Sequence, residues 1–368
     1  MLEGLVFGWR TAVLVTATAV VLPVALGLWF SFHDRRAART LAALLVVLVG
    51  VFTPWTIGFA GFYDRWPWLT FLPVANALWA APLLWLYACA LTTGGWPARW
   101  WVHLLPGAAQ FVWQAAAFIL PLSLKGRWSD LTSPVSELVV AVGLAVGFIG
   151  YGWATARVLS RHRRRLARSR SDDAGFAAGW LDRVTVAGAA LGVFWVTYET
   201  WDAVRPLGYR GLMGLYLGVA AMAVYLAVEG WRQTRTPWPR PEVDAPDAGA
   251  PARDWRAQGR VWAERVRAEG WHRQPDLTLS GLARKLGTNA GYLSRAVNEG
   301  LGVNFSTFVN DLRSDEVAER LLAGSDEGVL DLALEAGFAS KASFNRAFLA
   351  RHGVTPRQMR ARARRPES

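Results

Sequence analysis

Two phenylalanines and one arginine near the C-terminal end of this chain form a pattern that suits contact with an anionic partner. Phe344 and Phe348 are spaced so that they lie on the same face of a helix. If both pack inward, Arg346, midway between them, points outward. A guanidinium is always charged, and its planar set of donors matches phosphate groups and the edge of guanine. The net charge of +12 also favours an anionic partner, either nucleic acid or lipid headgroups.

Enzymatic chemistry is not indicated. The sequence contains no His-Glu-x-x-His motif and no pair of carboxylates at a spacing typical of an intramembrane protease. Its one cysteine, Cys89, lies in an apolar run, which excludes an intramolecular disulfide and a metal site built on cysteines. We therefore predict that the protein is not an enzyme and has no catalytic residues, no metal and no cofactor.

Long apolar runs dominate residues 1–232. Hydrophobic residues make up 53 % of the chain although it carries 40 basic side chains, and its 21 tryptophans suit membrane–water boundaries. Each run is as long as the ~20 residues that a membrane-spanning helix needs. A cleaved signal peptide is the alternative for the first run, but that run is too long and six more follow. We predict a seven-helix transmembrane sensor domain with helices at Thr11–Phe32, Leu41–Phe62, Leu69–Leu91, Trp101–Leu122, Val135–Leu159, Val184–Val204 and Leu212–Glu229.

The distribution of basic residues predicts the orientation of these helices. With the N-terminus outside, the inner loops and the segment after the last helix carry fourteen basic residues, and the outer segments carry six. Basic residues are enriched on the cytoplasmic side of membrane proteins. We expect a multi-pass protein of the inner (plasma) membrane, with its N-terminus outside and its C-terminal domain in the cytoplasm.

Polar residues within the apolar runs are candidates for a ligand site, because burying them in a membrane is costly. In this topology several lie toward the outer ends of their helices and could line an outward-facing pocket together with aromatic residues. The alternative is that carboxylates near helix ends reach water or pair with Arg205. The candidate ligand-binding residues are Asn76, Trp79, Gln114, Glu137, Glu199 and Asp202.

The remainder of the chain has a different character. Residues 233–253 are rich in Pro, Ala and Gly and predict a linker, whereas apolar residues recur at helical spacing over 254–368. Within this last region, Leu277–Gly287 and Thr288–Gly300 predict two helices joined by a turn at Gly287, with Ser280 as the cap of the first. The pattern recurs in Val329–Phe338 and Ser340–Gly353, and a longer helix at Phe305–Leu322 separates the two pairs. Helix, short turn, helix is the spacing of a DNA-binding helix-turn-helix unit.

The second pair resembles the AraC/XylS family of transcription regulators. The residues that match the family signature are Gly337, Phe338, Ser340, Phe344, Arg346, Phe348, Gly353, Thr355, Pro356 and Arg360. Tyr292, Leu293, Ser294 and Arg295 match the first recognition helix of the family. The sequence departs from the family at Met359, where an aromatic residue is usual, and at Ala296–Val297, where a bulkier pair is common.

The resemblance implies which residues contact DNA. Two recognition helices would lie in the major groove, and the Arg-rich C-terminal end, with Arg357, Arg360, Arg362, Arg364 and Arg365, would contact phosphates. For Arg295 and Arg346 the alternative is pairing with acids within the domain. The implied DNA-binding residues are Gly291, Tyr292, Ser294, Arg295, Lys341, Ala342, Ser343, Asn345, Arg346 and Arg360.

Together these features predict an all-α protein, a seven-transmembrane helix bundle followed by a soluble double helix-turn-helix domain. The favoured function is a membrane-integrated one-component transcription regulator that senses a signal through its membrane domain and binds promoter DNA. The alternatives are a transporter or receptor-like protein whose helix-turn-helix tail only tethers or regulates it. The expected partners are double-stranded DNA and the lipid bilayer. A small-molecule ligand, a partner membrane protein and a second copy of the chain are left open.

Overall fold

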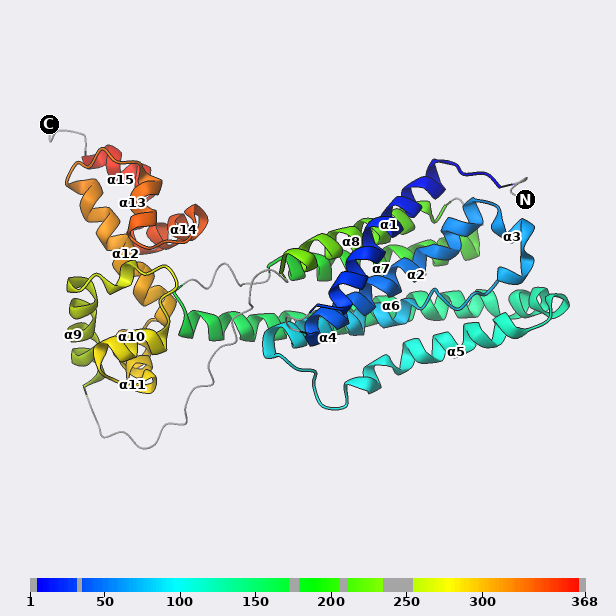
Figure 1. The fold of residues 1–368 in the computed structure, drawn as a ribbon, viewed down its shortest axis with the longest axis horizontal. Coiled ribbons are helices and arrows are strands. Elements are labelled where there is room, and N and C mark those ends of the chain that lie inside the picture. Colours follow the sequence, from blue (N-terminus) through cyan, green and yellow to red (C-terminus); the bar gives the residue numbers. More distant parts are fainter. Residues whose placement is uncertain (1–4, 32–34, 172–178, 206–210, 234–253, 364–368) are drawn as a thin grey trace. The chain divides into compact units, whose positions relative to one another are not determined.

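The computed structural model describes residues 5–31, 35–171, 179–205, 211–233 and 254–363, without the side chains of Ser133, Pro134, Glu199 and Ala203. The chain divides into two compact units, Met1–Leu159 with Ala178–Arg240, and Ser160–Ala177 with Pro241–Ser368 (Figure 1). Every named element in the described residues is helical, and β pairing there is limited to one isolated bridge between Arg170 and Thr278. The predicted all-α class is confirmed. Most of the predicted linker, residues 234–253, lies outside the described residues.

The helices of the first unit follow the seven apolar runs. The third run is interrupted, because residues 70–76 form turns and irregular backbone before the helix begins. The elements of this unit are α1 (Trp9–Trp29), α2 (Arg35–Phe59), α3 (Phe62–Arg65), η1 (Pro67–Leu69), η2 (Ala77–Trp79), α4 (Ala80–Thr93), η3 (Trp100–Leu104), α5 (Leu105–Ile119), α6 (Leu122–Ser169), α7 (Gly179–Val204) and α8 (Met213–Gln233).

Five helical segments among the described residues are long and apolar enough to cross a membrane, rather than the seven expected. They are α1, α2, the joined η3 and α5, the part of α6 from Val135, and α8. The run around α4 falls short in length, because its helical part covers only Ala77–Thr93. Helix α7 is long enough but is not among the five. Its mean hydropathy is lowered by Asp182 and Arg183 near its start and by Glu199 and Asp202 near its end.

Helix α2 lies at the centre of the first unit. It packs against α1, α4 and α8, and its side chains from Leu41 to Phe52 are largely buried. The irregular segment before α4 approaches α2 so closely that a Cβ at Gly50 would lie 2.1 Å from the carbonyl oxygen of Val74. Only glycine fits at that position of α2.

The second unit contains the five helices predicted between Leu277 and Gly353, in the predicted order, and further helical elements before and after them. They are α9 (Trp255–Ala268), η5 (Trp271–Arg273), α10 (Leu279–Leu286), α11 (Ala290–Arg295), the π-helical turn η6 (Ala296–Gly300), α12 (Phe305–Leu322), α13 (Val329–Glu335), α14 (Lys341–His352) and α15 (Pro356–Ala363). One cap differs from the prediction. Thr278 rather than Ser280 caps α10, because its extended backbone lets its hydroxyl accept from the amide of Gly281.

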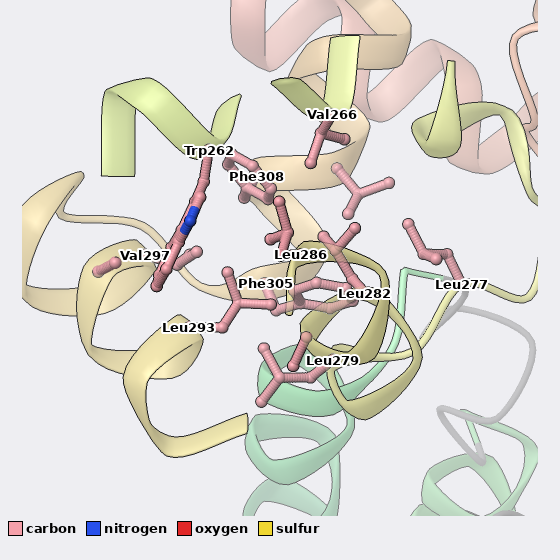
Figure 2. Packing of buried hydrophobic residues seen from close by; sticks show 13 residues of the cluster. Trp262, Val266, Leu277, Leu279, Leu282, Leu286, Leu293, Val297, Phe305 and Phe308 are labelled. Atoms are coloured by element: carbon pink, nitrogen blue, oxygen red, sulfur yellow. The ribbon is translucent and has the colours of Figure 1, made fainter. Parts of the chain in front are cut away.

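Two apolar cores stabilise this unit, and α12 belongs to both. Figure 2 shows the first core, in which Phe305 and Phe308 of α12 pack among side chains of α9, α10 and α11. The second core contains Val317 and Leu321 from the other half of α12, with Phe338, Phe344 and Phe348. A single helix therefore connects two separately packed helix-turn-helix units.

A buried polar network lies on α12 between the two cores. Arg313 is 1 % exposed, and its guanidinium donates to the carbonyl oxygens of His272 at 2.7 Å and Gln274 at 2.5 Å. One turn further on, the Glu316 carboxylate accepts from His272 Nε2 at 2.6 Å and from Arg273 Nη2 at 2.9 Å. Burial raises the pKa of Glu316, but the hydrogen bonds from His272 and Arg273 outweigh burial and lower the pKa to about 2.

The lowered pKa of Glu316 predicts a loss of stability in acid. Because its pKa is about 2 in the folded state and about 4.5 unfolded, the contribution is present above pH 4.5 and is lost as the pH falls toward 2. The fragment Asp254–Ser368 should lose about 3 kcal/mol of unfolding free energy over this range beyond what its Glu316→Gln variant loses. Denaturant titrations at a series of pH values measure it. The exposed Glu299→Gln variant should follow the wild type, and identical pH profiles for wild type and Glu316→Gln would contradict the assignment.

Candidate DNA-binding interface and a second candidate site

The first helix-turn-helix is built around Gly287. This residue ends α10 with a φ of +71°, a left-handed conformation that glycine adopts without strain. Asn289 then caps α11 by accepting from the amide of Tyr292 at 2.7 Å, while Leu293 is fully buried. These contacts leave Gly291 exposed and Ser294 half-buried on the outer side of α11.

The π-helical turn η6, which contains Ala296 and Val297, packs closely against α9. Ala296 and Val297 are buried in the π-helical turn, and a Cβ at Gly259 of α9 would lie 2.9 Å from the Ala296 carbonyl oxygen. At the end of the turn, a Cβ at Gly300 would lie 2.2 Å from the carbonyl oxygen of Trp255. The turn η6 therefore lies directly against the α9 backbone, with no room for a Cβ at Gly259 or at Gly300.

The second helix-turn-helix has the same three features, a turn glycine, a capping side chain and a buried apolar face, built from different residues. Gly337 has a φ of +97°, and a Cβ there would lie 2.4 Å from the carbonyl oxygen of Arg273. Ser340 caps α14 by accepting from the amide of Ser343 at 3.2 Å. Phe344 and Phe348 are buried and contact each other edge to face, with ring centroids 5.5 Å apart. The predicted inward face of α14 is confirmed.

An exposed face of α14 is left for a partner. Lys341, Ala342, Asn345 and Arg346 are all exposed and recur at the spacing that places residues on one side of a helix. Among the described residues, the Arg346 side chain has no hydrogen bond or ion pair, so the alternative of internal pairing finds no support at this position. Arg295 differs, because its Nε lies 3.9 Å from Glu299 Oε1 and its guanidinium lies 5.9 Å from the Trp255 ring centroid.

Besides Arg295, four of the implied DNA-binding side chains are used within the domain. One is Ser294, whose hydroxyl accepts from Asn298 Nδ2 at 3.0 Å. The Tyr292 ring is half-buried and its centroid lies 5.7 Å from that of Trp255. The Ser343 hydroxyl donates to the carbonyl oxygen of Ser340 at 2.9 Å. Arg360 donates to the carbonyl oxygen of Glu327, and this contact turns part of its guanidinium toward the domain. These engaged side chains are less suited to contact DNA than the exposed face of α14.

An arginine that the sequence did not single out holds α14 in place. Arg351 binds Asp315 of α12 in a two-pronged pair, with its Nε 3.0 Å from Oδ1 and its Nη2 2.9 Å from Oδ2. The hydrogen bond to Asp315 raises the pKa of Arg351 above its ordinary value. Asp311 adds a contact at 3.4 Å from Arg351 Nη1. Asp311 and Asp315 are spaced so that they lie on one face of α12, which was the available sequence signal for this ion pair. The spacing does not show which helix that face meets.

Basic residues continue along α15. Arg357 is exposed and Arg362 lies near the end of the helix, also exposed. Arg364 and Arg365, which the sequence also suggests as phosphate contacts, lie outside the described residues.

In the first unit, half of the residues proposed as ligand-binding line one cavity of about 440 Å³. Gln114, Glu137 and Asp202 are among its lining residues, together with aromatic side chains such as Trp113 and Tyr198. The side chain of Glu199 lies outside the described residues.

Asn76 and Trp79 do not line this cavity. Asn76 is 4 % exposed and donates to the carbonyl oxygen of Pro73 at 3.1 Å. Trp79 donates through Nε1 to the carbonyl oxygen of Leu104 at 2.8 Å. Both side chains therefore support the backbone around the start of α4 and α5.

Comparison with known proteins identifies the C-terminal region. A helix-turn-helix domain family matches residues 282–362. A protein of Staphylococcus aureus named an HTH-type transcriptional regulator is 40 % identical over 89 residues, which cover 24 % of this chain and 12 % of that protein. A regulator of Bacillus subtilis with the same type of name is 33 % identical over 91 residues, covering 25 % and 12 %.

One solved structure also matches. The C-terminal domain of AraT, a response regulator from Geobacillus stearothermophilus, is 29 % identical, with a TM-score of 0.26, and the match covers 30 % of this chain and 87 % of that one. The family model concerns the C-terminal part of this chain, and the chain spans about 12 % of the length of the curated relatives. The helices from α10 to α15 are an AraC-type helix-turn-helix domain.

Proposed function

We propose that this protein is a membrane-integrated one-component transcription regulator. The observation that supports it most directly is the pair of helix-turn-helix units joined by α12, in the same chain as five helices suited to a membrane. In this proposal the first unit receives a signal and the second binds promoter DNA in the cytoplasm.

The length of α12 supports binding to two successive major grooves. An α-helix rises 1.5 Å per residue, so the 18 residues of α12 span about 27 Å. Successive major grooves on one side of DNA are about 34 Å apart. A connector of this length, with a recognition helix beyond each of its ends, is of the size needed to engage both grooves. The exposed face of α14 would contact base edges, and Arg357 and Arg362 would contact phosphates.

A route from the signal to DNA is offered by α6. Its residues up to Leu159 belong to the first unit, and those from Ser160 belong to the second. Just beyond its end, Ser171 is 3 % exposed, its hydroxyl accepts from Arg313 Nη2 at 3.2 Å, and its amide donates to the Leu277 carbonyl oxygen at 3.0 Å. We propose that movement of α6 reaches α12 through Ser171 and Arg313.

The isolated fragment Asp254–Ser368 should fold and bind DNA. It contains both apolar cores, and its arginines would release counterions from the phosphates, so the binding constant should fall steeply with salt. Circular dichroism checks folding, and electrophoretic mobility shifts on sequences selected from random duplexes check binding. A folded fragment that binds no selected sequence would refute a DNA-binding role.

Arg346 should discriminate between sequences. Arg346→Ala should cost about 1–3 kcal/mol on the selected site and little on random DNA, because it removes a base contact. The double change Arg357→Ala with Arg362→Ala should weaken both kinds of binding alike and reduce the salt dependence. Arg351→Ala on the same helix is the matched control, since it should lower stability by roughly 1 kcal/mol through loss of the Asp315 pair. An equal loss on all sequences for Arg346→Ala would show a phosphate contact instead.

Reporter fusions should place Ser129 outside the cytoplasm and the C-terminal end inside. Five and seven crossings both put the C-terminal end on the side of the membrane opposite the N-terminus. They predict opposite sides for Ser129. With Ser129 outside, the seven arginines between Arg157 and Arg170 lie inside, in agreement with the positive-inside rule. Alkaline phosphatase should therefore be active at Ser129 and inactive after Ser368. A cytoplasmic Ser129 would mean that the run around α4 does not cross.

A further inference from the structure

An apolar groove runs along the pair of helices α1 and α2. Its volume is about 980 Å³, and every described residue that lines it is aliphatic or aromatic. Small side chains such as Ala42 and Ala43 leave room there beside larger neighbours such as Leu26 and Phe30. Leu26 is 62 % exposed and Phe30 is 68 % exposed, so the groove is open along one side. In a membrane, an open apolar groove of this kind faces acyl chains.

The groove ends beside basic residues. Trp29 lines the groove, and the Arg39 guanidinium lies over the Trp29 ring, 5.8 Å from its centroid. Arg36 precedes Arg39 by three residues, a spacing that makes the two side chains neighbours on the surface of α2. Both arginines are exposed. One end of the apolar groove therefore carries positive charge.

Little negative charge competes with an anion at this end. None of α1, α2 and α4 contains an acidic residue. Helix α8 packs against α1 and α2, and its single acid, Glu229, is paired with Arg232 at 3.5 Å. Asp34 precedes α2 and lies outside the described residues, but three arginines follow it before Leu41, so this segment of the sequence has a positive net charge. The chemical complement of the charged end is an anion.

Tryptophans indicate the depth of the charged end in the membrane. Trp96 donates through Nε1 to Thr40 Oγ1 at 3.0 Å, and the Trp100 ring lies beside the Trp96 ring with centroids 4.7 Å apart. Tryptophan is enriched at the membrane–water interface. From Trp29 the groove reaches Leu22, about 10 Å along α1, which fits within one leaflet of a hydrocarbon core about 30 Å thick. A charged headgroup at the interface and an acyl chain within one leaflet are the two parts of a phospholipid.

We propose that this groove binds an anionic phospholipid of the cytoplasmic leaflet. Arg36 and Arg39 would bind the phosphate, and one acyl chain would lie in the groove along α1 and α2. Basic pockets between membrane helices on the cytoplasmic side bind anionic headgroups in this way. The inference rests on the proposed function, in which the first unit spans the membrane with its N-terminus outside. The bound lipid would hold the inner ends of α1 and α2 together.

The test is native mass spectrometry of the full-length protein in detergent, titrated with phosphatidylglycerol or with phosphatidylcholine of the same acyl chains. One phosphatidylglycerol should bind about tenfold or more tightly than phosphatidylcholine, because the choline group cancels the charge of the phosphate. Equal binding of the two lipids would overturn the proposal. A lipid-free dimer would also overturn it, since the groove would then be a contact between two copies of the chain.

Charge variants locate the headgroup. The double change Arg36→Gln with Arg39→Gln should weaken phosphatidylglycerol binding at the tight site by about tenfold or more. Arg10→Gln is the matched control, because Arg10 lies over the Trp9 ring, 5.0 Å from its centroid, at the other end of α1 and does not line the groove. A tight site that survives the double change would place the lipid elsewhere and overturn the proposal.

Filling the groove tests the position of the acyl chain. Ala43→Phe adds a ring inside the groove and leaves both arginines in place, so phosphatidylglycerol binding should again weaken by about tenfold. Ala19→Phe is the matched control, because Ala19 is an exposed residue of α1 that does not line the groove. Thermal unfolding midpoints check that both variants are folded. Unchanged phosphatidylglycerol binding in folded Ala43→Phe would contradict the proposal, and the arginine variants decide it if Ala43→Phe does not fold.

The outcome is separable from that of the proposed function. Lipid binding is measured in detergent without DNA, whereas topology is measured with reporter fusions and DNA binding with the isolated fragment. Loss of lipid selectivity with intact topology and DNA binding would remove only this inference. Selective lipid binding in a chain that binds no DNA would leave the lipid site and remove the regulatory function.

Discussion

The second unit depends on one buried charge, the guanidinium of Arg313. A guanidinium cannot lose its proton in a protein, so burying it is tolerable only when its donors are satisfied. Arg313 achieves this by binding the carbonyl oxygens of His272 and Gln274 and the hydroxyl of Ser171. These three residues lie outside α12. Their contacts with Arg313 hold the segments that contain them at the midpoint of the helix that joins the two cores.

Neighbouring contacts strengthen the same junction. Glu316 binds His272 and Arg273, and the close approach of Gly337 to the Arg273 carbonyl joins the turn of the second helix-turn-helix to η5, which lies just before α10 in the chain. Because backbone on both sides is restrained, the separation of the two recognition helices is set by packing rather than by a flexible loop. A rigid separation suits a partner with a fixed repeat such as duplex DNA.

In the first unit, polar side chains compensate for irregular backbone. Turns before α4 leave amide and carbonyl groups without helical partners, and these groups need hydrogen bonds wherever water is absent. Gln110 and Gln114 of α5 supply them at Ala75 and Leu78, and Asn76 supplies one at Pro73. Polar residues in apolar runs thus have a structural role here.

The sequence by itself determined the all-α class, the division into a strongly apolar and a more polar part, the bounds of α12 and the inward face of α14. These features follow from local composition, periodicity, caps and turn glycines. Spacing shows that Arg346 faces away from Phe344 and Phe348, but it cannot show that Arg351 pairs with Asp315 or that Arg360 turns toward Glu327. Only the tertiary structure decided those partners, the burial of Arg313, the interruption before α4 and the meeting of Gln114, Glu137 and Asp202 at one cavity. The physical reason is that each of these features joins residues far apart in the chain, and side-chain periodicity carries no information about which distant segment a given face will meet.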